Sequence, residues 1–280
     1  STLSLNLQEM FGKDSLNAFL YADDTLLVGA SQQNTQALLD AVAQTGASYG
    51  MELHWNKFQL LQVGGIYHFS APDGNIIAPT EVMTYLGATL YADGSVKREL
   101  NRKLGAAWAD FSKLARLWNH ASLPKDRRIR IYKAVVVSRL LYGLSTAWLN
   151  AAELRRLQGF HCRCLRRILG IAPSYLSRVS NLKVLQEAGE VPLGKQLLQS
   201  QLILYGRVVR APDTDPIRKL TFIAGATEPA TNQYIRKVGR PRNTWATMLQ
   251  KETFKMGTDH HHQITCEDEW KRAVHQHCIA

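Results

Sequence analysis

The pattern of apolar residues changes once along the chain, close to Gly94, and this change limits the possible folds more than any other feature. Before Gly94 the apolar residues form short runs separated by turn signals such as Asp73-Gly74, which is typical of strands. After it they recur every three or four residues over long stretches, which is typical of amphipathic helices. The sequence therefore predicts an α+β fold whose strands are confined to the first third.

The first third of the chain contains a hairpin signal, one helix and further strands. Residues 16–28 hold two β-prone segments on either side of an Asp pair, and this predicts a hairpin with Asp23 and Asp24 at its tip. Residues 31–49 have helical spacing and end before Gly50, a common helix stop. Three apolar runs predict antiparallel strands: residues 59–63, 66–69 and 82–90.

Helix signals dominate after residue 94. Three long helices are predicted in succession, over residues 95–118, 124–148 and 150–169. The third starts with Asn150 and Glu153, which have the spacing of a capping box. Residues 211–242, with their Pro, Gly and Thr, are expected to form a loop. Four further helices are predicted over residues 181–188, 193–210, 243–254 and 267–277.

Charge divides the chain at nearly the same place. Residues 1–96 hold two basic and nine acidic residues, whereas residues 97–170 hold 17 basic and four acidic ones, within a net charge of +11 for all 280 residues. A basic protein attracts polyanions, so nucleic acid is the expected partner, ahead of an anionic membrane surface. A carboxylate metal site joined to a phosphate-binding module would produce this asymmetry, although solvated helix faces would produce it too.

Several classes of protein have no support in the sequence. No apolar run is long enough to span a membrane, since the best candidate, residues 134–149, contains Arg139. The first residues lack the features of a signal peptide, and four cysteines make no disulfide framework, so we expect an intracellular protein, nuclear or cytoplasmic, without a disulfide partner. The phosphate-binding loop of nucleotide hydrolases and the nucleophile elbow of esterases are missing.

Asp23 and Asp24 are the strongest candidates for chemistry. Two adjacent carboxylates are costly to bury unless their charge is compensated, and a divalent cation can compensate it. Mg²⁺ prefers one or two carboxylates together with phosphate oxygens of a substrate, and paired ions assist phosphoryl transfer. The pair therefore predicts a site for Mg²⁺, or for Mn²⁺ in its place. The alternative is an ordinary Asp-Asp turn that faces solvent.

The residues around this pair resemble a reverse transcriptase, and more specifically that of a non-LTR (LINE-type) retrotransposon. The match begins with Tyr21-Ala22-Asp23-Asp24 and keeps the order found in the second half of the polymerase palm. The later matching elements are Gly50, Lys57, Tyr85-Leu86-Gly87, Tyr132-Lys133-Ala134, Leu141-Tyr142-Gly143, Trp148, Cys164-Leu165-Arg166 and Gly239-Arg240-Pro241-Arg242.

The resemblance implies catalytic roles for three residues. Asp23 and Asp24 would be the catalytic carboxylates that hold the metal. Lys57 falls where such polymerases carry a lysine that protonates the departing pyrophosphate. However, His54 and Phe58 stand where the family usually has Asn and a Thr or Ser, and a solvated lysine at a strand edge is the alternative for Lys57.

The resemblance also implies residues that bind the primer and its template. The primer 3′ end would lie beside Tyr21 and Ala22, and a primer-grip turn would be formed by Tyr85, Leu86 and Gly87. Basic residues on a helical thumb would bind the phosphate backbone without sequence preference. The candidate contacts are Arg127, Arg128, Arg130, Lys133, Arg163, Arg166 and Arg167, followed by Arg240 and Arg242 in a basic segment for which a simple loop is the alternative.

Three regions follow from these assignments. Residues 1–92 would be part of a polymerase palm, residues 93–171 a basic α-helical thumb, and residues 172–280 a basic helical region with a loop near 211–242. The implied activity is RNA-directed DNA synthesis from an RNA template, a DNA primer and dNTPs. The family's first catalytic Asp and its fingers would precede Asp23, where only 22 residues stand, and Asp14 among them has the setting of a turn.

We therefore expect this chain alone to be inactive, because two-metal catalysis requires a third carboxylate. The alternative from another class is a non-catalytic nucleic-acid-binding protein that derives from a decayed element.

Overall fold

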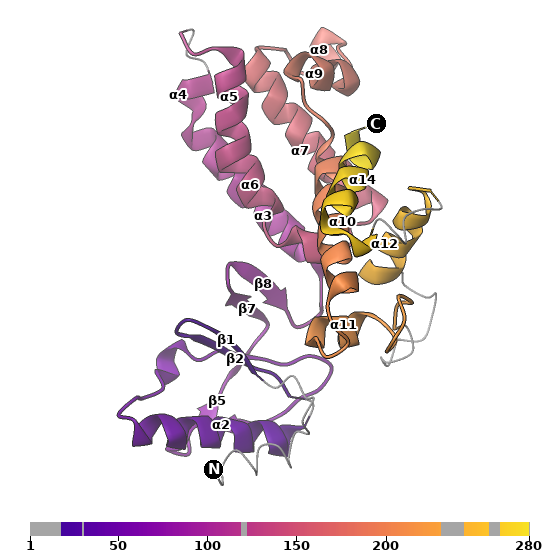
Figure 1. The fold of residues 1–280 in the computed structure, drawn as a ribbon. Helices are drawn as coiled ribbons and strands as arrows, with labels where there is room; N and C mark the ends of the chain where they lie inside the picture. The colour runs from indigo at the N-terminus through magenta and orange to yellow at the C-terminus, as the bar shows by residue number, and fades with distance from the viewer. Residues whose placement is uncertain (1–17, 30, 119–121, 231–243, 258–263, 280) are drawn as a thin grey trace. The chain divides into compact units, whose positions relative to one another are not determined.

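The computed structural model describes residues 18–29, 31–118, 122–230, 244–257 and 264–279 (Figure 1). The chain divides into two compact units, an N-terminal unit of residues 1–95 and a helical unit of residues 96–280. All the named strands of the described residues belong to the N-terminal unit. The predicted α+β class is confirmed.

The first described elements of the N-terminal unit are a hairpin and a helix, as predicted. Strands β1 (Ala18–Tyr21) and β2 (Asp24–Leu27) pair antiparallel, with Tyr21 opposite Asp24. Helix α2 (Gln32–Ser48) follows, and the chain leaves it through Gly50, whose φ of 73° is a left-handed conformation that glycine adopts without steric cost.

Three further pairs of short strands follow in the described part of this unit. They are β3 (Leu60–Leu61) with β6 (Pro79–Thr80), β4 (Phe69–Ser70) with β5 (Ile76–Ile77), and β7 (Val82–Tyr85) with β8 (Ala88–Tyr91). The prediction of antiparallel pairing is wrong for β3, which pairs parallel with β6, because the chain reverses once more between them in addition to the β4–β5 hairpin. The apolar run over residues 82–90 is a hairpin rather than one strand, since its apolar Leu86 lies in the turn.

Side chains of α2 bind the backbone of β4 and so replace a neighbouring strand. The Gln36 amide accepts from the Ser70 N–H at 3.0 Å and donates to the Ser70 carbonyl at 2.9 Å. Leu38 and Leu39 of α2 are buried, as is Phe69 of β4. These contacts fix α2 against β4.

The first half of the helical unit differs from the prediction of three long helices in two places. The stretch 95–118 is divided at Leu114, because the Phe111 carbonyl accepts from the Trp118 indole at 2.8 Å instead of continuing the helix. The stretch 124–148 ends its helix at Leu141. The elements are α3 (Val96–Lys113), α4 (Ala115–Trp118), α5 (Lys125–Tyr132), the π-helical turn η2 (Lys133–Val137), α6 (Ser138–Leu141), the 3₁₀ turn η3 (Leu144–Thr146) and α7 (Ala151–Leu169).

The start of α7 confirms the predicted capping box. The Asn150 side chain accepts from the Glu153 N–H at 3.0 Å, and the Glu153 carboxylate accepts from the Asn150 N–H at 2.8 Å. The helices that follow in the described residues are α8 (Ser174–Ser177), α9 (Asn181–Ala188), α10 (Leu193–Arg210), α11 (Pro216–Thr221), α12 (Trp245–Phe254) and α14 (Glu267–Ile279). Helices α8 and α11 were not predicted, and α11 lies inside the expected loop, where Asp215 caps its first turn.

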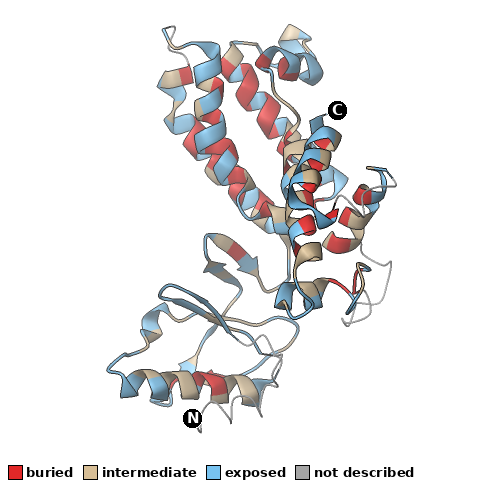
Figure 2. Cartoon of the chain, viewed as in Figure 1, coloured by how far each residue is buried: buried red, intermediate tan, exposed pale blue. Residues whose placement is uncertain are grey.

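Two clusters of buried residues form the interior of the helical unit (Figure 2). The first joins α3, α5, α6, α7, α9 and the start of α10, and the second joins α10 to α12 and α14. In the second cluster a side chain at Gly206 would place its Cβ 2.2 Å from Nε1 of the buried Trp270, so this position requires glycine. No described helix is long and apolar enough to cross a membrane. All four cysteines are free thiols.

A buried polar pair lies in the first cluster between α5 and α7. The Tyr132 hydroxyl hydrogen-bonds Nδ1 of His161 at 2.9 Å, and neither side chain is exposed to solvent. Burial lowers the pKa of His161 from 6.5 to about 4, and the nearby Lys133 contributes in the same direction. His161 is therefore neutral in the folded protein at physiological pH.

This pKa predicts a loss of stability in acid. Because the pKa is lower in the folded state, the unfolded chain takes up the proton first, and stability falls as the pH drops from 6.5 towards 4 by about 3 kcal/mol. Urea unfolding at pH 7 and pH 4 would measure this loss. A His161→Gln variant lacks this titrating group, so its loss of stability between pH 7 and pH 4 is expected to be smaller by about 3 kcal/mol. An equal loss in both proteins would contradict the assignment.

Candidate catalytic and nucleic-acid sites

The turn between β1 and β2 holds the candidate catalytic carboxylates. Asp23 lies within the two-residue turn and Asp24 is the first residue of β2, and both are exposed. Ala22 has a φ of 51°, a left-handed conformation that is uncommon for a residue other than glycine. Backbone conformations of this kind cost about 1–3 kcal/mol and cluster at active sites and ligand-binding loops.

The turn between β7 and β8 has a similar property. Leu86 and Gly87 both have positive φ, at 47° and 75°, which is the pattern of a type I′ hairpin turn. The Tyr85 hydroxyl donates to the Phe19 carbonyl at 3.4 Å and joins this hairpin to β1. The turn with the Asp pair and the turn predicted to grip the primer therefore belong to two neighbouring hairpins.

A cavity of about 390 Å³ lies between these hairpins and the segment that follows α2. Its walls include Asp24, Lys57 and Tyr85, three residues predicted from separate parts of the sequence. Lys57 is exposed and belongs to a 3₁₀ turn, η1 (Trp55–Lys57), rather than to a strand edge. Tyr21, Ala22, Asp23, Leu86 and Gly87 do not line the cavity.

The metal donors of the turn are chemically suitable but incomplete. Carboxylate oxygens are the hard ligands that Mg²⁺ prefers, and Asp23 and Asp24 supply them in adjacent positions. Within the described ranges no three or more His, Cys, Asp or Glu side chains come together. The donors therefore fit one edge of a divalent cation site and leave the rest to other ligands.

The predicted nucleic-acid contacts on the helical unit fall into separate groups. Arg127 and Arg130 are exposed on α5. Arg163 and Arg167 are exposed on α7, one turn apart, with their guanidinium carbons 5.8 and 5.2 Å from the centre of the Trp108 ring. Stacking of this kind restricts two long side chains and leaves their N–H groups available to phosphate oxygens.

Arg166 is a correction to the predicted contact set. Its side chain is 7% exposed, and the guanidinium donates to the carbonyls of Ala172 at 3.3 Å and Val179 at 2.6 Å. It also donates to Ser177 Oγ at 3.4 Å and Asn181 Oδ1 at 3.1 Å. A guanidinium held by four protein acceptors in the interior is not available to a phosphate backbone.

Two other predicted contacts are also engaged within the protein. Lys133 forms an ion pair with Glu190 at 3.0 Å, and Arg128 donates to the Trp118 carbonyl at 2.8 Å. Arg240 and Arg242 lie outside the described residues.

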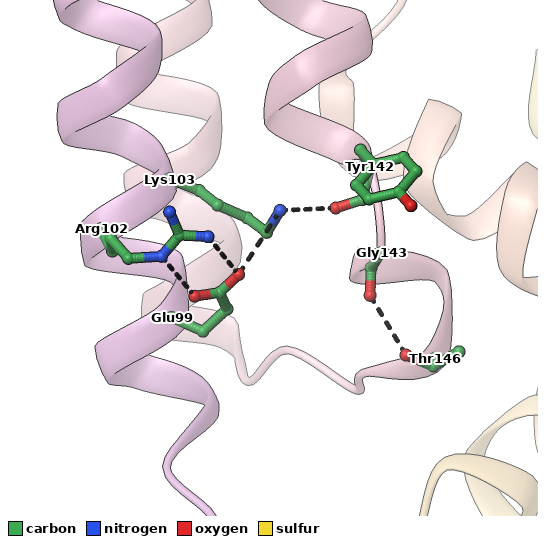
Figure 3. Close-up of polar contacts among 6 residues, drawn as sticks. All are labelled: Glu99, Arg102, Lys103, Tyr142, Gly143 and Thr146. Carbon is green, nitrogen blue, oxygen red and sulfur yellow. Dashed lines mark hydrogen bonds and ion pairs between the residues drawn. The ribbon is translucent and has the colours of Figure 1, made fainter. Parts of the chain in front are cut away.

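Lys103, one of the 17 basic residues of residues 97–170, is a second interior cation. Its Nζ donates to the Tyr142 carbonyl at 2.6 Å and lies 3.4 Å from the Glu99 carboxylate, which also binds Arg102 at 2.8 Å (Figure 3). Burial lowers the pKa of Lys103, and the Glu99 charge opposes that shift. The spacing of Glu99, Arg102 and Lys103 on one helix is the signal that could have found this group.

The N-terminal segment is similar in sequence to a known protein family. Residues 2–90 match the family described as reverse transcriptase (RNA-dependent DNA polymerase). The segment is reverse-transcriptase-like. The β1–β2 hairpin, Lys57 and the turn between β7 and β8 fall within it.

A second match covers most of the chain. An uncharacterized transposon-derived protein of Caenorhabditis elegans is 25% identical over 249 residues, which are 85% of this chain and 85% of that protein. No solved structure matches the chain significantly. The family match supports a reverse transcriptase relationship for residues 2–90, and the second match is to a protein described only as transposon-derived.

The left-handed Ala22 in this reverse-transcriptase-like segment predicts an unusual response to glycine. Ala22→Gly is expected to raise the free energy of unfolding of the N-terminal unit by about 1 kcal/mol, because glycine removes the steric cost of positive φ. Ala18→Gly, in the adjacent strand, is the control and is expected to lower it by about 0.5–1 kcal/mol. Denaturant unfolding would measure both. A loss of stability in both variants would show that the turn is not strained.

Proposed function

We propose that this chain is the C-terminal part of the palm, followed by the thumb, of an RNA-directed DNA polymerase from a LINE-type retrotransposon. The observation that carries the proposal is the cavity of about 390 Å³ that brings Asp24, Lys57 and Tyr85 together inside the segment that matches the reverse transcriptase family. These residues are up to 61 positions apart in the sequence, and a solvent-facing Asp-Asp turn would not require the other two beside it.

Each part of the proposed site has a chemical task. Asp23 and Asp24 would hold Mg²⁺ or Mn²⁺, which when bound would neutralise charge that develops on phosphate oxygens. The ammonium group of Lys57 would donate a proton to the departing pyrophosphate and be left as the neutral amine. Tyr21 and Ala22 would contact the primer 3′ end, and the turn at Tyr85, Leu86 and Gly87 would hold the primer backbone.

The helical unit would bind the backbone of the template–primer duplex. We keep Arg127, Arg130, Arg163 and Arg167 as the contacts, because they are exposed, and we leave out Arg166, which is buried. Phosphate contacts of this kind give affinity without sequence preference.

Catalysis by these residues alone is not expected. The described residues bring two neighbouring carboxylates to the turn and no third, and metal-assisted phosphoryl transfer requires the ions to be held in fixed geometry. We therefore propose that the 280-residue chain does not polymerise until further palm and fingers residues are supplied.

Primer extension on an RNA template tests this proposal. The 280-residue chain is expected to incorporate no dNTP above background, and a fusion that supplies an upstream reverse transcriptase palm and fingers is expected to restore incorporation. Asp24→Asn in the fusion should abolish it, whereas Asp40→Asn, at an exposed position on α2, should not. Persistent inactivity of a well-folded fusion would favour the decayed, non-catalytic alternative. Activity of the 280 residues alone, lost in Asp23→Asn, would overturn the proposed incompleteness.

The duplex contacts predict a salt dependence. Each phosphate contact releases counterions, so affinity falls as salt rises. Replacing both Arg163 and Arg167 with Gln is expected to make the slope of log affinity against log salt less steep by about 2. Fluorescence anisotropy with a labelled RNA–DNA duplex would measure the slope. Lys255→Gln is the control, since Lys255 is already paired with Glu252 at 2.6 Å and should change the slope little. An affinity that stays flat between low and high salt would contradict the proposed role.

A further inference from the structure

The helical unit carries an exposed apolar and basic surface that none of the proposed duplex contacts uses. We define it as the α8–α9 tip, residues 172–183, which comprise α8, the connecting residues and the first turn of α9 (Figure 1). Three apolar side chains there are largely exposed: Tyr175 at 79%, Leu176 at 65% and Leu182 at 66%. The tip contains two basic residues, Arg178 and Lys183, and no acidic residue.

The interior of the protein holds this tip in a fixed conformation. Arg166 reaches it from α7, and its four hydrogen bonds go to acceptors on both sides of Arg178. The Ser177 hydroxyl donates to the Ala172 carbonyl at 3.0 Å and accepts from the Val179 N–H at 3.3 Å. The Ser180 hydroxyl caps α9 by accepting from the Lys183 N–H at 3.2 Å. A loop with this many internal bonds presents its exposed side chains without further ordering.

The backbone of the tip is also strained. Arg178 has a φ of 54° and is one of three non-glycine residues with positive φ in the described parts of the chain. The other two are Ala22 and Leu86, in the turns already assigned to the polymerase site. Strain of this kind persists where the surrounding structure determines it, and it is concentrated at ligand-binding segments.

We propose that the α8–α9 tip binds an unpaired nucleotide of single-stranded nucleic acid. An exposed aromatic ring beside cations is the combination that binds single strands, because the ring stacks on a base and the cations contact the backbone. Tyr175 would supply the ring, with Leu176 and Leu182 as apolar walls, and Arg178 and Lys183 would supply the charge. The absence of acidic residues between 172 and 183 favours a polyanion over a basic or neutral partner.

This site goes beyond the proposed polymerase function, because it takes an unpaired strand rather than a duplex. Substitutions at the tip and substitutions of the duplex contacts on α5 and α7 should therefore affect different ligands. Loss of the tip would leave duplex binding intact, and loss of Arg163 and Arg167 would leave stacking at Tyr175 intact.

Fluorescence anisotropy of the full chain with a short labelled RNA, single-stranded or paired, tests the proposal. Tyr175→Ala is expected to weaken single-strand binding by roughly fivefold to a hundredfold, while Tyr175→Phe, which keeps the ring, stays within about twofold of the unmodified protein. Duplex binding should be unchanged in both. Single-strand affinity that is unchanged in Tyr175→Ala would overturn the proposal, and so would equal losses for single strand and duplex.

Two further measurements test the charge of Arg178 and the contact at Tyr175 without unfolding the tip. Arg178→Gly removes the charge and relieves the positive φ, so the tip should remain folded while the salt slope for single-strand binding falls by about 0.7. Ultraviolet crosslinking of an oligonucleotide that contains 5-iodouridine should attach it to the peptide that includes Tyr175. A crosslink found only on α5 or α7, or an unchanged salt slope, would show that single strands bind elsewhere and would overturn the proposal.

Discussion

The cost of removing charge from water decides what each ionic residue of this chain can do. A charged side chain is buried only when protein acceptors or opposite charges compensate it, and Arg166 and Lys103 meet that condition. Both side chains hold neighbouring segments of the helical unit together through hydrogen bonds. Asp23 and Asp24 are exposed and have no such compensation within their own turn, so their charge remains available to a cation. The division between structural and functional charges follows from burial rather than from sequence position.

Strained backbone conformations are a second, independent feature of the proposed nucleic-acid contacts. The three left-handed non-glycine residues of the described ranges are Ala22, Leu86 and Arg178, and each lies in a turn proposed to contact nucleic acid. Glycine would remove the steric cost at each position, but a side chain stands there instead. In the N-terminal unit the Tyr85–Phe19 hydrogen bond joins the two strained hairpins, and in the helical unit Arg166 holds the strained connection. Strain and its support therefore occur together.

Local patterns were sufficient to predict the hairpin, helix α2 and the capping box at Asn150, because each depends on residues within a few positions of one another. The division of α3 from α4 was not predictable in this way. It depends on the Trp118 indole reaching back to the Phe111 carbonyl. Arg166 was misassigned for a similar reason, since an arginine on a basic helix gives no sequence signal of burial. The cavity that joins Asp24, Lys57 and Tyr85 depends on tertiary packing, although each residue was found from its motif.

The two units differ in what they need in order to function. Binding a phosphate backbone requires only exposed cations on a folded surface, and Arg163 and Arg167 on Trp108 satisfy this without any other part of the chain. Metal-assisted nucleotidyl transfer requires several carboxylates in fixed geometry, and the turn supplies two. Substitutions can therefore abolish catalysis while binding persists, because losing one carboxylate removes a metal ligand whereas losing one cation only weakens affinity. For the same reason binding alone does not test the proposed polymerase function, and only a measurement of synthesis does.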